Sequence, residues 1–235
     1  MPMSTKEAKY KTVGFFYLVC DASFGYFQAK EQNSFYEENR CARWSILSSA
    51  LSIESFANCL LETLSLSNNQ FRKLDRLPSL GKIDEYLKLS GVERLDQDKT
   101  EVKSISELIR ARNDFVHVKT SRTELQISPA TLQSTDTPRY DAMLNPETHP
   151  NLGIFKLGAF WHSDEARMAL QAVSDFLRYS LALVDDDNSR SLRNNLVTKL
   201  EAAGVALSIM SEDYTNELEK LRHEGIDFTF LLDDD

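Results

Sequence analysis

The sequence predicts an all-α protein built mainly from long helices. Only eight Gly and six Pro occur in 235 residues, and four of those prolines fall between Pro129 and Pro150. The rest of the chain is therefore nearly free of helix breakers. Hydrophobic residues make up 42% and charged residues 27%, as in ordinary globular proteins. A chain of this length can bury a sizeable core without disulfides or metals.

The first 64 residues predict two long helices. Residues 5–34 combine a helical pattern with many aromatic rings, and rings at that density usually lie in a core or an interface. Residues 35–64 form the second pattern. Its half RWSILSSALSIESFANCLLE mixes large apolar residues with Ser and Ala, which suits tight packing against more than one neighbour.

Two further helices are expected before residue 120. The pattern over 78–90 begins with Pro78, which suits a first turn, and ends at Gly91. The pattern over 100–118 contains EVKSISELIRARNDFVHV. On a helical wheel Arg112 falls in the middle of its apolar face. That face consists of Val102, Ile105, Leu108, Ile109, Phe115 and Val116.

Residues 120–160 predict a β-hairpin or an irregular flap, because Pro, Thr, Ser and Asn accumulate there. The runs TELQIS and LGIFKLGAF look like strands. Helicity resumes at Ser163, an expected N-cap followed by two acidic residues. The resulting helix should continue to about Val184.

The acidic run DDDNSR at 185–190 predicts a break, after which a last helical pattern continues toward Arg222. We therefore expect a helical domain over 1–187, with the flap at about 120–160, and a C-terminal helical extension with an acidic tail over 188–235. The apolar side of the last helical pattern consists of Leu192, Leu196, Leu200, Ala203 and Leu207.

Composition and motif searches exclude several functional classes. No secretory signal pattern and no membrane-spanning run occurs, so we expect a cytoplasmic protein without membrane contact. Cys20, Cys41 and Cys59 are odd in number and widely spaced, which predicts reduced core thiols. No zinc-binding, phosphate-binding Gly-rich or Gly-x-Ser-x-Gly motif is present, so neither a metal nor a cofactor is expected.

The formal net charge of -9 disfavours nonspecific attraction to a phosphate backbone, so any nucleic-acid contact must come from a local site. His149, His162 and His223 are interpreted as packing or surface histidines.

Arg112 needs a partner, because a guanidinium set into an apolar face is costly to bury unpaired. The helix over 35–64 offers Glu54 and Asn58, one turn apart within an apolar stripe. If the two helices pack through these faces, Glu54 is expected to orient Arg112 by a hydrogen bond, and Asn58 to satisfy neighbouring polar atoms. The alternative is a purely structural buried ion pair.

His117 lies about 140° around the helix from Arg112, with Asn113 between them, so the three side chains form a curved polar strip. Imidazole can give or take a proton near neutral pH, whereas Arg supplies only charge and hydrogen bonds. This pair suits phosphoryl chemistry, in which Arg112 would hold the nonbridging oxygens and His117 would move a proton.

Arg112, Asn113 and His117 match the signature of the HEPN superfamily, the helical domains of many prokaryotic toxin and defence ribonucleases. That signature is an Arg, a polar residue and a His after four to six intervening positions. ALSIESFANCLLE also resembles the second helix of such proteins, and the resemblance covers roughly residues 7–185. It implies a homodimer with both motifs at a shared cleft, and metal-independent RNA cleavage. In that reaction the 2′-hydroxyl attacks phosphorus, Arg112 stabilises the phosphate and His117 is the general acid or base, with Asn113, Glu54 and Asn58 as auxiliary residues.

Two other interpretations stay open. The flap, the extension after residue 187 and the acidic balance depart from the family pattern, and many HEPN-like domains are noncatalytic modules. Such a module would act with a partner, such as an antitoxin or a nucleotidyltransferase. The third interpretation is an unrelated helical interaction protein. The sequence leaves open the RNA target, the regulator and the purpose of the last fifty residues.

Overall fold

The computed structural model describes residues 8–117, 126–127, 143–144, 147–202, 205–209 and 212–232. It confirms a mostly helical fold. The α-helices are α1 Phe15–Glu31, α2 Phe35–Thr63, α3 Asn68–Leu74, α4 Ser79–Leu89, α5 Thr100–Val116, α6 Ser163–Ala182, α7 Asp186–Leu196 and α8 Glu212–His223. The strands are β1 Ala8–Lys11, β2 Gln126–Ile127, β3 Met143–Leu144, β4 Thr198–Ala202 and β5 Val205–Ile209, and short 3-10 helices cover Gly158–Phe160 and Thr229–Leu231.

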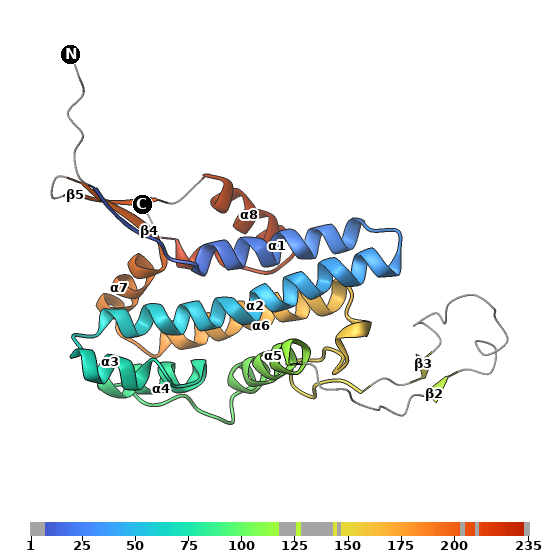
Figure 1. The fold of residues 1–235 in the computed structure, drawn as a ribbon, viewed down its shortest axis with the longest axis horizontal. Coiled ribbons are helices and arrows are strands. Elements are labelled where there is room, and N and C mark those ends of the chain that lie inside the picture. The colour runs from blue at the N-terminus through green and yellow to red at the C-terminus, as the bar shows by residue number, and fades with distance from the viewer. Residues whose placement is uncertain are drawn as a thin grey trace, which may run out of the picture.

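Helix α2 is the central element of the fold. It contacts α1, α4, α5, α6 and α7, and Figure 1 shows it beside α1 with α6 behind it. Its N-cap Ser34 accepts a hydrogen bond from the Glu37 backbone N–H, which satisfies one of the donors left free in the first turn. The largest fully buried side chains of the described residues include Phe15, Phe56, Trp161, Phe176 and Phe228.

Helices α1 and α2 approach closely at Gly25. A Cβ on this residue would lie 2.9 Å from the Ser45 nitrogen and 3.0 Å from the Cys41 carbonyl oxygen. Ser45 also donates a hydrogen bond of 2.7 Å to the Ala22 carbonyl across the interface. The small residues of the α2 sequence therefore allow the tight packing that was predicted for this segment.

The first predicted helix is wrong at its start. Helix α1 begins at Phe15, and residues 8–11 instead form β1, which pairs antiparallel with β4 in a sheet of order β1-β4-β5. The partner strand lies almost 200 residues away in the sequence, so the local pattern could not reveal this pairing. The adjoining Val13 N–H donates to the Thr198 hydroxyl at 3.2 Å, which extends the junction.

The predicted helix over 192–222 is also wrong in its middle. Helices α7 and α8 are present, but β4 and β5 pair antiparallel between them, with Leu200 opposite Leu207. The apolar residues of this segment fit a period of two as well as a helical stripe, and short apolar runs are ambiguous in this way. Pairing with β1 favours the strands because it satisfies their backbone groups.

The residues after 187 share one hydrophobic core with the helices before them. Leu192 and Leu196 of α7 are buried, and so are Ile226, Phe228 and Leu231. Arg178 of α6 forms an ion pair of 2.8 Å with Asp227. The C-terminal segment is thus packed against α1, α2 and α6.

The predicted flap lies largely outside the described residues, including 128–142. Strands β2 and β3 pair antiparallel, with Gln126 opposite Leu144, so part of TELQIS is a strand. LGIFKLGAF is not a strand. Its Phe155 forms an isolated bridge with Thr148, and its last three residues form the 3-10 turn Gly158–Phe160.

Smaller differences concern helix ends and one missed helix. The N-cap of α6 is His162 rather than Ser163, whose backbone N–H and hydroxyl contact Glu38 instead. Helix α3 was not predicted, although Ser67 and Gln70 form a capping box at its start.

The three cysteines are free thiols, but only Cys59 is buried in the core, whereas Cys20 and Cys41 are partly exposed. Burial raises the pKa of Cys20 to about 12 and that of Cys59 to about 11, so both stay protonated. None of the described helices is long and apolar enough to cross a membrane.

Candidate functional site

Helix α5 carries the predicted motif on the side of the bundle that contacts α2 and α6. Val102, Ile105, Leu108 and Ala111 are buried, so the first three turns are firmly packed. The predicted apolar face ends earlier than expected, because Val116 is half-exposed. The motif therefore lies where the helix emerges from the core.

Arg112 lies at the border of the buried face rather than in its middle, and its side chain is 27% exposed. Its Nη1 donates a hydrogen bond of 2.8 Å to Oδ1 of Asn113. Its Nη2 lies 3.9 Å from Oε2 of Glu54, which is ion-pair distance but too long for a hydrogen bond. The expected orienting hydrogen bond from Glu54 is therefore wrong, and a loose ion pair takes its place.

The two predicted auxiliary residues of α2 do not face inward together. The Glu54 side chain is 50% exposed and lies beside Arg112. Asn58 instead accepts a hydrogen bond of 2.7 Å from Nζ of Lys82, a buried ammonium on α4 that also pairs with Asp75 at 3.3 Å. Asn58 thus serves the α2–α4 interface and not the motif.

His117 is the C-cap of α5 and is exposed. Its backbone N–H donates a hydrogen bond of 2.9 Å to the Asn113 carbonyl. Asn113 therefore contacts both motif residues, the guanidinium through its side chain and the histidine through its backbone. This arrangement holds the last turn together and leaves the imidazole open to solvent.

Phe115 fixes the end of α5 against the rest of the protein. Its ring packs on that of Trp161 at 5.5 Å between centroids, and the guanidinium of Arg43 on α2 lies over the Phe115 ring, 5.7 Å from its centroid. Asn39 on α2 donates to the carbonyls of Gly158 and Trp161 at 3.0 and 2.7 Å. Arg43, a cation of α2, is thus held close to the motif helix.

The opposite side of α5 is covered by the loop 147–157. Glu107 accepts hydrogen bonds from the backbone N–H groups of Asn151 and Leu152 at 2.9 and 2.8 Å, and from the Asn151 side chain at 2.6 Å. Burial alone would raise the pKa of Glu107, but these hydrogen bonds outweigh it and lower the pKa. His149 in this loop is buried, and burial lowers its pKa, so the imidazole is held neutral.

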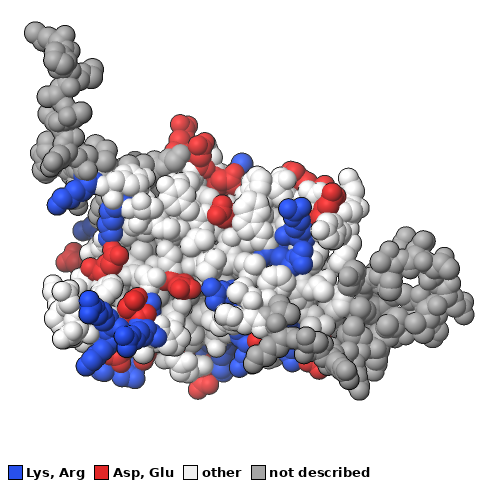
Figure 2. All heavy atoms as spheres, in the orientation of Figure 1, with Lys and Arg blue, Asp and Glu red and all other residues white. Residues whose placement is uncertain are grey.

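The face of the molecule formed by α1 and α2 carries little charge. Figure 2, drawn in the orientation of Figure 1, shows a broad uncharged area over these two helices with most charged side chains toward its margins. Phe24 and Trp44 are both about half exposed on this face and pack edge to face at 5.4 Å. The Glu54–Arg112 pair joins α2 to α5.

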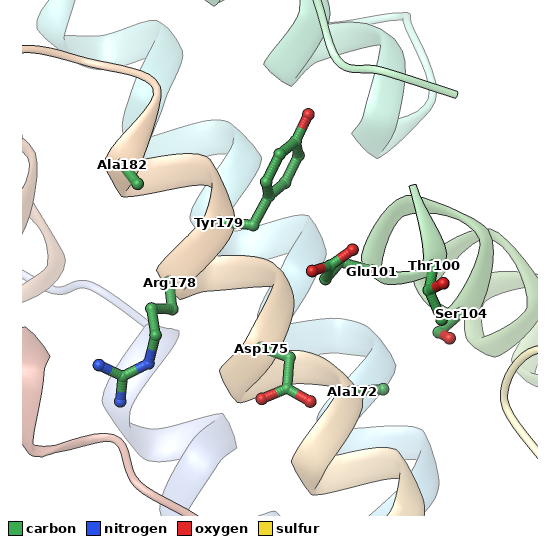
Figure 3. A pocket seen from close by; sticks show the side chains of 8 residues that line it. All are labelled: Thr100, Glu101, Ser104, Ala172, Asp175, Arg178, Tyr179 and Ala182. Atoms are coloured by element: carbon green, nitrogen blue, oxygen red, sulfur yellow. The ribbon is translucent and has the colours of Figure 1, made fainter. Parts of the chain in front are cut away.

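A pocket of about 400 Å³ lies between α5 and α6. Figure 3 shows the carboxylate of Glu101 directed toward α6, where Asp175 and Tyr179 line the pocket, while Arg178 points away from α5. Arg178 is already paired with Asp227. With two carboxylates in its lining, this pocket is poorly suited to a phosphate, so it is not a continuation of the Arg112 site.

The sequence analysis missed Arg43 and the contact between Glu107 and the loop 147–157. Arg43 lies three helical turns before Glu54, so the wheel that placed Glu54 beside α5 could also have placed Arg43 there. No local sequence pattern predicts the contact of Glu107 with the loop, because its partners lie more than forty residues away in the sequence. No family model, curated protein or solved structure matches this chain.

Proposed function

We propose that this chain is a HEPN-type, metal-independent endoribonuclease in which Arg112 and His117 act on the RNA backbone. The observation that carries the proposal is the pairing, at one helix end, of a partly exposed guanidinium with an exposed imidazole. The described contacts of Arg112 are one hydrogen bond to Asn113 and a loose ion pair with Glu54. A guanidinium has five N–H donors, so donors remain for the nonbridging oxygens of a phosphate.

The reaction needs one proton to leave and one to arrive. The 2′-hydroxyl oxygen attacks the adjacent phosphorus as it loses its proton to a base, and the bond from phosphorus to the 5′-oxygen breaks as that oxygen gains a proton. The products are a 2′,3′-cyclic phosphate and a 5′-hydroxyl end. His117 serves as the general acid or base, and Arg112 stabilises the charge that builds up on the phosphate.

Glu54 competes with the substrate in this scheme. Its carboxylate lies beside Arg112 and repels an incoming phosphate. Glu54→Gln should therefore tighten RNA binding several-fold without removing the motif. A gel-shift titration with the wild-type protein and this variant measures that change. Equal affinities would show that the Glu54 carboxylate does not oppose RNA binding at Arg112.

The central test is cleavage of single-stranded RNA by the purified protein in the presence of a chelator. His117→Ala and Arg112→Ala should each reduce cleavage at least a hundredfold, the size typical of losing a proton-transfer or charge-stabilising group. His223→Ala, at the end of α8, is the matched control and should retain full activity. RNA methylated on its 2′-oxygens should stay intact, because the nucleophile is blocked.

Intact RNA in all these reactions would favour the second candidate, a noncatalytic HEPN-like module. The net charge of -9 and the carboxylate beside Arg112 favour this candidate, because both weaken RNA binding. The module would form a stable complex with an antitoxin or a nucleotidyltransferase within a toxin–antitoxin or defence system. Co-purification with the product of a neighbouring gene would support it.

The resemblance also implies a homodimer with the motif at a shared cleft, and the sequence pattern predicts that the protein acts in the cytoplasm. Both remain part of this proposal.

A further inference from the structure

The pocket between α5 and α6 is a cavity that the proposed function does not use. Its volume of about 400 Å³ lies in the range of small-molecule sites. The α6 wall is one stripe of residues spaced three or four apart, namely Ala172, Asp175, Tyr179 and Ala182. The α5 wall comes from the start of that helix, namely Thr100, Glu101 and Ser104.

Two hydrogen bonds hold the walls of this pocket in place. The Tyr179 hydroxyl accepts a hydrogen bond of 3.2 Å from the Asp96 backbone N–H, which fixes the ring. The Ser104 hydroxyl donates a hydrogen bond of 3.2 Å to the Asn151 carbonyl, so the lone pairs of its oxygen remain available as acceptors. A ligand therefore loses little binding free energy to the ordering of these side chains.

The lining offers acceptors and negative charge but no free cation. The Glu101 carboxylate has no hydrogen bond or ion pair with any described residue, and in Figure 3 it lies between Tyr179 and Asp175. Asp175 accepts one hydrogen bond of 2.8 Å, from the Gln171 side chain. The guanidinium of Arg178 points away from α5, where it pairs with Asp227 and covers the Phe230 ring at 4.2 Å.

This imbalance defines the ligand by its chemistry. Two carboxylates on two helices favour a molecule with two positive charges, and the Tyr179 ring attracts cations to its face. The alanines of the α6 wall favour an aliphatic body between the charges. A metal ion does not fit, because no group of three or more His, Cys, Asp or Glu side chains converges among the described residues.

We propose that the pocket between α5 and α6 binds an aliphatic diamine, with one protonated amino group at Glu101 and the other at Asp175. Ammonium groups supply the donors that the lining lacks, and the hydrocarbon chain between them packs against the α6 wall. The site is independent of Arg112 and His117.

The first test is isothermal titration calorimetry of the purified full-length protein with 1,4-diaminobutane at constant ionic strength. Butylamine is the probe with one charge, and it should bind roughly threefold or more weakly, because it forms one partly exposed ion pair instead of two. Equal affinities for the two amines, or no detectable diamine binding, would overturn the proposal.

Glu101 also has a possible structural role, because a carboxylate in the first turn of a helix is stabilised by the helix dipole. Asp187→Asn is therefore the matched control, since Asp187 lies in the first turn of α7 and its loss changes the net charge equally. Glu101→Gln and Asp175→Asn should each weaken diamine binding by roughly threefold or more, and the control should not. A similar loss in the control would indicate attraction to the net charge alone and refute the site.

A change of shape without a change of charge tests the position of the ligand. Ala182 is exposed at the edge of the α6 wall, so Ala182→Trp should fill the pocket while the protein still folds, which circular dichroism checks. Diamine binding should then be lost. Unchanged binding in this variant would place the diamine elsewhere and overturn the proposal. None of these titrations involves RNA, so their outcome and that of the cleavage assay are separate.

Discussion

At the scale of single residues, His149 and Glu107 make the contact between the loop 147–157 and α5 sensitive to pH. His149 is buried, and no described residue hydrogen-bonds its Nε2. Burial lowers its pKa below 6.5, nearby Glu107 and Asp114 act in the opposite direction, and Lys156 and Arg110 add to the lowering. The folded protein thus binds a proton at this imidazole less readily than the unfolded chain does.

The free energy of unfolding should therefore fall as the pH drops below about 6.5, because His149 binds a proton in the unfolded chain at a pH where it stays neutral in the folded protein. Below about 4.5 the lowered pKa of Glu107 acts in the same direction, since its unfolded form is protonated first. His149→Phe should flatten the first phase and leave the second. Urea unfolding between pH 7.5 and 4 measures both, and an unchanged first phase in the variant would exclude His149 as its source.

Gly158 is a second residue on which the motif depends. A Cβ there would lie 2.7 Å from Cδ2 of Phe115, so Gly158→Ala must displace the ring that anchors the end of α5. We expect a loss of about 1–3 kcal/mol in the free energy of unfolding, as for other overpacked sites. Urea unfolding measures it.

Phe115→Leu supplies the matched test, because a smaller side chain leaves room for the added methyl. The double variant should be less destabilised than the sum of the two single changes. Strict additivity would show that the two residues do not compete for this space.

At the scale of elements, the α1–α2 contact depends on the absence of a side chain at Gly25. Gly25→Ala would force a methyl against backbone atoms of α2, and backbone cannot turn aside as a flexible side chain can. The better helix propensity of Ala, up to about 1 kcal/mol, should not offset this clash, and a net destabilisation of about 1–3 kcal/mol is expected.

Gly81→Ala, in α4, is the control for this change, since its Cβ would meet only ordinary contacts at 3.5 Å with the side chains of Leu77 and Pro78. It should be neutral or slightly stabilising. Thermal melting of both variants gives the comparison. Equal melting temperatures would show that α1 and α2 can move apart to accommodate the methyl group at position 25 without loss of stability.

Helices were predictable where local pattern and tertiary contacts agree. The second predicted helix, over 35–64, corresponds closely to α2, because its caps and its apolar spacing both act within the element. The stretch 198–209 fits a helix and a strand about equally well. Its pairing with β1 decided between them, and pairing is a property of two distant segments.

At the scale of the whole molecule, the described C-terminal residues are part of the core. Phe228 is fully buried, and Tyr26 and Lys30 of α1 contact Glu224 at 3.1 and 2.8 Å. The predicted boundary at 187 therefore crosses a packed interface. A chain ending at residue 187 should lose cooperative unfolding, because it would expose the apolar surface that these residues cover.

Circular dichroism and calorimetry of the chain 1–187 measure this loss. A truncated chain that melts cooperatively at the temperature of the full protein would restore the predicted division into a domain and an extension. A chain ending at residue 232 is the control and should unfold like the full protein.

The motif was partly predictable for the same reason as the helices. The placement of Arg112, Asn113 and His117 as a strip around one helix follows from 3.6 residues per turn. The hydrogen bond from Arg112 to Asn113 does not follow from it, because neighbouring side chains on a helix point about 100° apart. The roles of Glu54 and Asn58 could not follow from a wheel. The packing of three helices decides which face of α2 contacts α5. It also decides that Asn58 accepts a hydrogen bond from Lys82.

The sequence alone therefore determined the helical class, most helix positions and the residues of the motif, since these arise from spacing and capping within single segments. Only the tertiary structure decided the β1-β4-β5 sheet, the exposure of Arg112 and His117, and the contact between the half-exposed rings of Phe24 and Trp44. Each of these depends on contacts between segments far apart in the chain, whose free energy no local pattern contains.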